Sequence, residues 1–95
     1  MQISVRFFTI LREIVGKREE TFTFPSQRVT VRIVLEKLNK QYGKEFRQYV
    51  YDSNGEVKGY LQLLVNGRSL PKTEGLDSEL SDGDVVAILP PVSGG

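Results

Sequence analysis

The 95-residue sequence contains no cysteine and no histidine. These absences exclude disulfide bridges, thiol nucleophiles, histidine general bases and zinc sites built on either residue type. We therefore expect no metal site and no bound cofactor. Any chemistry in which this chain takes part must use a carboxylate, an amine or a hydroxyl group.

Long apolar runs are also missing. The longest, around residues 61–65, is far shorter than the roughly 20 residues that a membrane-spanning helix needs. The first residues alternate between apolar and polar side chains and contain no apolar segment typical of a signal peptide. We expect a cytoplasmic protein that does not enter a membrane.

The length and the charge narrow the function further. Ninety-five residues suit one small domain and are too few for two. Residues 1–47 carry ten basic and five acidic side chains, and residues 48–95 carry three basic and seven acidic ones. Neither half combines dense positive charge with interleaved aromatic residues, so we expect no direct binding to nucleic acid.

Apolar periodicity predicts four strands and two helical segments. Residues 2–8, 20–24, 60–65 and 85–89 are predicted to be strands, with a short helical turn at residues 10–15 and a long helix at residues 31–42. Gly16 is expected to end the first helical segment, and Thr30 and Gly43 to bound the second. Residues 46–51 give no clear signal, residues 52–55 form a turn, and residues 70–80 are expected to be a loop with a helical turn.

The order strand, strand, helix, strand, strand is typical of the α+β class. It predicts a β-grasp (ubiquitin-like) fold, in which one long helix packs on one face of a mixed sheet. We assign residues 1–89 to this domain and residues 90–95 to an extended C-terminal tail. Residues 43–59 receive no predicted structure beyond the turn.

The tail, Pro90-Pro91-Val92-Ser93-Gly94-Gly95, is the segment most suited to a function. Two prolines hold the backbone extended directly after a predicted buried strand, and so project it away from the core. Gly94 and Gly95 lack a Cβ atom, which allows the active site of a partner to approach the backbone closely. The simpler alternative is an idle chain end.

Three segments together resemble the MoaD family. They are residues 6–16 (RFFTILREIVG), residues 80–89 (LSDGDVVAIL) and the tail PPVSGG. The family comprises sulfur carriers and the small subunits of molybdopterin synthase, together with related archaeal ubiquitin-like modifiers. The likeness covers nearly the whole chain, and in the middle, at residues 42–59, the sequence is closer to the archaeal branch.

The resemblance implies a mechanism for the tail. A MoeB-like activating enzyme would use ATP to adenylate the carboxylate of Gly95, and a sulfur donor would then convert the acyl-adenylate to a thiocarboxylate. A MoaE-like large subunit would accept the tail and pass the sulfur to a pterin during molybdenum cofactor synthesis. This chain would be a co-substrate and not an enzyme, and ATP would be bound by its partner.

Two apolar side chains are expected to help this tail dock. Phe8 shares a face with Ser4 and Arg6, opposite the core face, and Leu89 is predicted to face the same way directly before the tail. Exposed contiguous apolar surface often marks an interface, although helix or loop residues could cover both side chains. The resemblance places docking residues at these two positions and a basic residue at Arg12.

The sequence leaves several uses of Gly95 open. An activated Gly95 could donate sulfur for molybdenum cofactor synthesis or for tRNA thiolation. It could equally be attacked by a lysine of a target protein, which would make the chain a protein modifier. A non-covalent β-grasp interaction module is a further alternative, but it leaves Gly94 and Gly95 without a role.

Overall fold

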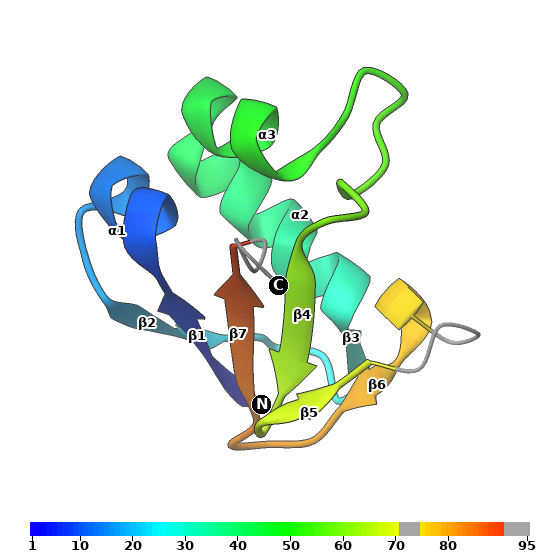
Figure 1. The fold of residues 1–95 in the computed structure, drawn as a ribbon. Coiled ribbons are helices and arrows are strands. Elements are labelled where there is room, and N and C mark those ends of the chain that lie inside the picture. Colours follow the sequence, from blue (N-terminus) through cyan, green and yellow to red (C-terminus); the bar gives the residue numbers. More distant parts are fainter. Residues whose placement is uncertain (71–74, 91–95) are drawn as a thin grey trace.

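The computed structural model describes residues 1–70 and 75–90. Its main sheet has the strand order β2-β1-β7-β4-β5. These strands are β1 (Gln2–Phe7), β2 (Glu19–Thr23), β4 (Gln62–Val65), β5 (Arg68–Ser69) and β7 (Val85–Leu89). The long helix α2 (Val31–Tyr42) crosses one face of the sheet (Figure 1). This is the predicted β-grasp arrangement, with a mixed sheet and one long helix against it.

The two central strands, β1 and β7, are parallel neighbours that lie far apart in the sequence. Ile3, Val5 and Phe7 on β1 are fully buried, as are Val86 and Ile88 on β7. Alternate side chains of a strand point to opposite faces, so the predicted period-2 pattern places these residues under the helix. The core face of both strands is therefore confirmed.

Helix α2 has the predicted limits. The Thr30 hydroxyl accepts a hydrogen bond from the Ile33 amide at 3.3 Å, which satisfies one of the free donors in the first turn. The helix ends at Gly43, whose φ of 75° suits a residue without a Cβ atom. Its apolar stripe is fully buried and consists of Val31, Val34, Leu35 and Leu38.

The first helical segment is also confirmed, as helix α1 (Thr9–Val15). Gly16 ends it in the left-handed conformation and donates its amide to the Arg12 carbonyl at 2.9 Å. Only Leu11 of this helix is buried, and Ile10 faces solvent. Helix α1 therefore connects β1 to β2 and adds little to the core.

Several short elements were absent from the prediction. Helix α3 (Lys44–Val50) occupies the segment that gave no clear signal, and its buried residues are Phe46 and Val50. The two-residue strands β3 (Val29–Thr30) and β6 (Glu79–Leu80) pair with each other, and β5 completes a hairpin with β4. Strands of two residues have no periodicity that a sequence pattern could reveal. The helical turn η1 (Gly75–Asp77), by contrast, confirms the helical turn that was expected within residues 70–80.

A polar cluster joins β2 to α2 at the edge of the sheet. The Glu20 carboxylate accepts hydrogen bonds from Lys17 at 2.6 Å, from Gln41 at 2.7 Å and from the Tyr42 hydroxyl. Partial burial by itself raises the pKa of Glu20, but these three donors outweigh it, and the pKa of Glu20 is lowered from its ordinary value of 4.5. Burial and the neighbouring carboxylate raise the pKa of Tyr42.

This cluster predicts a loss of stability in acid. Because the folded-state pKa of Glu20 lies below its unfolded value, its contribution is present above about pH 4.5 and disappears as the pH falls through the folded-state pKa. We expect the free energy of unfolding of Glu20→Gln to change less between about pH 5 and pH 3 than that of the unmodified protein. Urea titrations at a series of pH values measure this difference. Glu13→Gln, at an exposed carboxylate, is the matched control, and parallel pH profiles for all three proteins would contradict the assignment.

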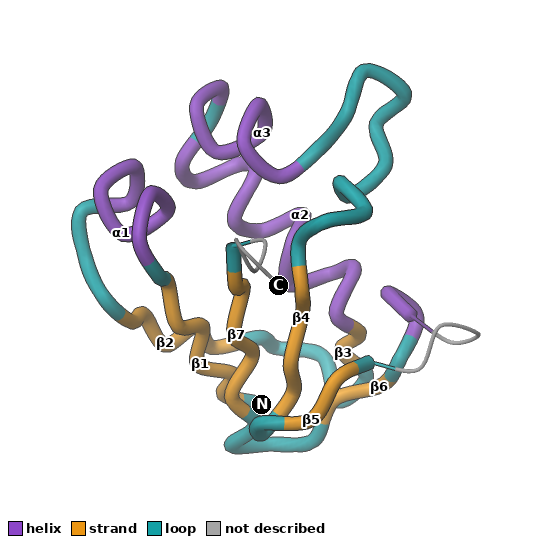
Figure 2. The backbone as a smooth tube through the Cα atoms, viewed as in Figure 1, coloured by secondary structure: helices purple, strands orange, loops and turns teal. Residues whose placement is uncertain are grey.

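The fold leaves one face of the sheet without a helix. Figure 2 shows α2 behind β7 and β4, with α1 and α3 beyond the upper ends of the strands. Among the described residues, the outward positions of β1 and β7 are partly or fully exposed, including Ser4, Arg6, Ala87 and Leu89. This open face adjoins the point where the chain leaves β7.

Candidate functional site

The end of strand β7 is the centre of the candidate site. Leu89 is the last residue of β7 and lies between its two neighbouring strands: it pairs with Gln62 of β4, while the preceding residue, Ile88, pairs with Phe7 of β1. Pro90 follows and is half-buried. The tail therefore starts at the middle of the sheet, directly after the last paired residue of β7.

The strand register brings Phe8 and Leu89 together. Since Phe7 pairs with Ile88 in a parallel ladder, the next residues of both strands, Phe8 and Leu89, lie side by side. Neither side chain belongs to the core cluster or packs against it, and both are half-buried. The structure thus places these two predicted residues next to each other on the open face, and their role in docking stays a prediction.

Leu64 is an apolar residue of this face that the sequence pattern does not reveal. It pairs with Ala87 across β4 and β7, so its side chain shares the open face with Ala87 and Leu89. Its strand neighbours Leu63 and Val65 pack against the core, whereas Leu64 does not. Residues 63–65 are all apolar, so the sequence shows no alternation there. Alternation is the signal that assigns the residues of a strand to its two faces.

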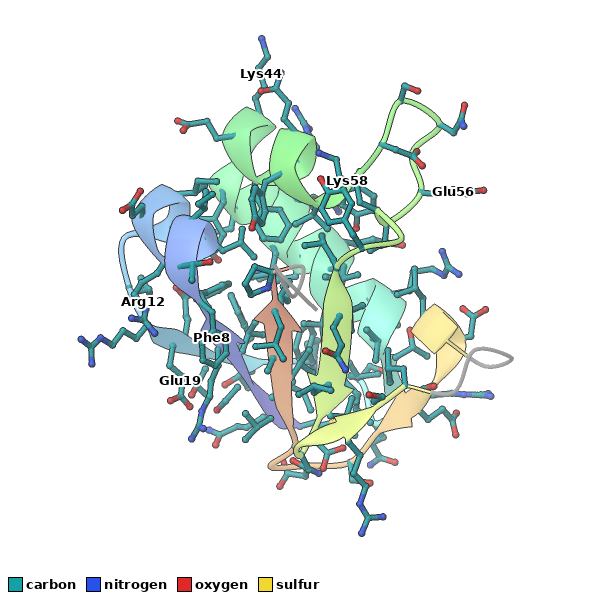
Figure 3. All side chains as sticks on the ribbon, in the orientation of Figure 1. Phe8, Arg12, Glu19, Lys44, Glu56 and Lys58 are labelled. Carbon is teal, nitrogen blue, oxygen red and sulfur yellow. The ribbon has the colours of Figure 1, made fainter. Side chains whose placement is uncertain are left out.

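Arg12 lies over Phe8, on the side of the tail formed by α1 (Figure 3). Its guanidinium carbon is 5.8 Å from the centre of the Phe8 ring, and its Nε donates to the Phe7 carbonyl at 3.4 Å. A cation held over an aromatic face is attracted by the ring electrons. Arg12 therefore covers part of Phe8 and at the same time presents a positive charge beside the start of the tail.

The rest of the predicted site, Pro91, Val92, Ser93, Gly94 and Gly95, lies outside the described residues. In the described part the structure contains no group of three His, Cys, Asp or Glu side chains that could hold a metal ion. None of its helices there has the length and apolar character needed to cross a membrane. The site that remains is an apolar surface with a basic rim around the start of the tail.

The sequence matches one family model over almost its full length. Residues 5–95 match the ThiS family. The chain is 36% identical over all 95 residues to small archaeal modifier protein 3 of Haloferax volcanii, with both proteins covered completely. It is 33% identical over 70 residues to a candidate sulfur carrier protein of Archaeoglobus fulgidus, which covers 74% of this chain and 78% of that protein.

Solved structures share the fold over the whole chain. The crystal structure of small archaeal modifier protein 1 of Haloferax volcanii superposes with a TM-score of 0.84 at 26% identity and full coverage of both chains. A candidate subunit 1 of the molybdopterin converting factor of Pyrococcus furiosus gives 0.74 at 31% identity, covering 97% of this chain and 99% of that one. A chain from the BexX–CysO complex of Amycolatopsis orientalis gives 0.72 at 25% identity, covering 98% and 99%.

Proposed function

This chain belongs to the ThiS family of ubiquitin-like proteins, and on that premise we propose that it carries sulfur on the carboxylate of Gly95. Its relatives are small archaeal modifier proteins and sulfur carriers. The single observation that carries the proposal is the end of the central strand β7, where Leu89 lies beside Phe8 and is followed by the first residue of the tail, Pro90. A chain without cysteine has no thiol on which to carry sulfur, so its terminal carboxylate is the group that fits.

The proposed chemistry takes place in two steps. An oxygen of the Gly95 carboxylate attacks the α-phosphorus of ATP, which forms an acyl-adenylate and releases pyrophosphate. A sulfide ion then attacks the acyl carbon and displaces AMP, which leaves a thiocarboxylate and releases a proton. ATP is bound by the activating enzyme, which we propose to be MoeB-like. The chain itself acts as a co-substrate and not as a catalyst.

As the receiving partner, we propose the MoaE-like large subunit of molybdopterin synthase, with this chain as the small subunit. The likeness to a candidate converting-factor subunit of Pyrococcus furiosus supports this acceptor. Phe8, Leu89 and Arg12 are proposed to contact both the activating enzyme and the large subunit, because the same tail must enter both active sites. We place both reactions in the cytoplasm.

A second candidate function is protein modification. It is favoured by the full-length likeness to small archaeal modifier protein 3, at 36% identity. In this use the amine of a target lysine attacks the activated carbonyl of Gly95 and forms an isopeptide bond with release of the activating group. Both functions share the fold, the tail and the adenylation step. They differ only in the nucleophile that attacks the activated carbonyl of Gly95, which is sulfide for a sulfur carrier and a lysine amine for a modifier.

Intact mass spectrometry of the untagged protein, purified from its own host, distinguishes the two functions. Exchange of one oxygen for sulfur at Gly95 raises the mass by about 16 Da, and we expect this species for a sulfur carrier. Carboxyl-terminal peptides should carry the whole shift. An unmodified mass, found together with carboxyl-terminal peptides of this chain joined through Gly95 to lysines of other proteins, would instead identify a modifier.

A further inference from the structure

Only three large apolar or aromatic side chains in the described part of the chain are strongly exposed. They are Ile10, Tyr60 and Ile33, with exposed fractions of 52%, 54% and 38%. We propose that Ile10 and Tyr60, together with Phe8 and Leu89, form one docking surface around the start of the tail, here called the tail-root surface. Its occupant is the activating enzyme that adenylates Gly95, and the inference rests on the proposed function.

The strand register places Ile10 and Tyr60 on opposite sides of the tail. Tyr60 precedes by two residues Gln62, which pairs with Leu89. Ile10 follows Phe8 by two residues, and Phe8 lies beside Leu89. Two residues span at most about 7 Å and neighbouring strands are about 5 Å apart, so both Cα atoms lie within about 12 Å of the Leu89 Cα atom. In Figure 1, α1 and the segment entering β4 lie on either side of the end of β7.

Tyr60 is exposed, yet two contacts hold it in place. The Lys58 ammonium nitrogen lies 5.8 Å from the centre of the Tyr60 ring, and it also donates to the Gln48 carbonyl of α3 at 2.8 Å. The Leu61 amide donates to the Lys58 carbonyl at 3.1 Å, which closes the turn that carries Tyr60. An aromatic ring already fixed before binding loses less entropy when a partner covers it.

The opposite side of the tail carries a strained residue. Thr9 has a φ of 48°, a left-handed conformation that is rare for a β-branched side chain. It lies between Phe8 and Ile10 and sets the turn from β1 into α1. Backbone strain of this kind persists where the surrounding structure requires it and is concentrated at functional sites. Thr9 thus fixes how two members of the tail-root surface are presented.

The length of the tail explains why the activating enzyme must reach this surface. Residues 91–95 span at most about 18 Å when fully extended. The active site that holds the Gly95 carboxylate therefore lies within about 18 Å of Pro90, so the walls around its entrance must meet the residues beside Pro90. The tail-root surface supplies those residues on both sides of the tail.

The charges around the tail-root surface define the chemistry of the partner. Arg12 lies over Phe8 on one side, and Lys58 lies over Tyr60 on the other. Across residues 1–70 and 75–90, no carboxylate forms an ion pair with either cation. A partner with an apolar centre and acidic side chains at its rim matches this surface, since complementary rim charges raise the rate of association. Figure 3 shows Arg12 and Lys58 on opposite sides of the end of β7.

The test is the kinetics of adenylation, followed as pyrophosphate release by the activating enzyme of the same host. We expect Tyr60→Ala and Ile10→Ala each to raise the KM for this chain about tenfold and to leave kcat unchanged, because they remove binding and not reacting groups. Tyr60→Phe should retain the KM of the unmodified chain, since the ring and its contact with Lys58 remain.

Ile33→Ala is the matched control, because Ile33 is also an exposed isoleucine but lies on α2, which covers the opposite face of the sheet. It should leave both constants unchanged, and thermal unfolding should show all four variants folded. An unchanged KM for Tyr60→Ala and Ile10→Ala would overturn the tail-root surface while leaving the proposed function intact. Absence of pyrophosphate release from the unmodified chain would overturn the proposed function and this surface with it.

Discussion

Removal of Gly94 and Gly95 should abolish thiocarboxylate formation while leaving the thermal unfolding temperature nearly unchanged. The reacting carboxylate moves back by two residues, so it no longer reaches the α-phosphate of ATP in the activating enzyme, and Ser93 brings a side chain to the reacting carbonyl. The buried residues that the structure describes end at Ile88, so the deletion removes no described core contact. Intact mass spectrometry after incubation with ATP, the activating enzyme and sulfide measures the loss.

Ser93→Ala is the control for this deletion, because it changes the tail but keeps its length and both terminal glycines. It should acquire the mass increase of about 16 Da at a rate close to that of the unmodified chain. A truncated chain that still acquired the increase would show that sulfur is carried elsewhere. A large drop in its unfolding temperature would show instead that the tail stabilises the fold.

Phe7→Ala and Phe8→Ala form a matched pair, since they remove the same side chain from adjacent positions on opposite faces of the sheet. Phe7 is fully buried and meets Tyr42 edge-to-face, with ring centres 6.0 Å apart. We expect Phe7→Ala to lower the free energy of unfolding by about 3–5 kcal/mol, which is a large share of the roughly 5–15 kcal/mol typical of a domain. Phe8 is half-buried under Arg12, so Phe8→Ala should lower it by about 1–2 kcal/mol.

Phe8→Ala should lose more binding affinity than Phe7→Ala, although it loses less stability. At a temperature where both variants are folded, Phe8→Ala should weaken binding to the activating enzyme about tenfold or more, as truncation of an aromatic interface residue commonly does. Phe7→Ala should bind nearly as well as the unmodified chain. Urea unfolding measures the stabilities and isothermal calorimetry the affinities. Equal losses of affinity in both variants would mean that Phe8 acts only through the fold.

The β-grasp fold could be predicted because its main elements have clear local patterns. Ile3, Val5 and Phe7 alternate along one strand, and Val31, Val34, Leu35 and Leu38 follow the helical period. The predicted limits of α2 agree with the observed ones, and so do those of β7, where Val86 and Ile88 alternate in the same way. Helix α3 was not predicted, because its seven residues bury only Phe46 and Val50 and are too few for a clear helical stripe.

The amino-acid sequence by itself determined which face of β1 and of β7 is buried and that a tail with two glycines follows the last strand. Both depend on residues close together in the chain, where spacing alone sets the direction of a side chain. Only the tertiary structure decided that β1 and β7 are parallel neighbours, and hence that Phe8 lies beside Leu89 with Ile10 and Tyr60 on either side of the tail. Strand order and register depend on pairing between distant segments, and no local pattern specifies which segments meet.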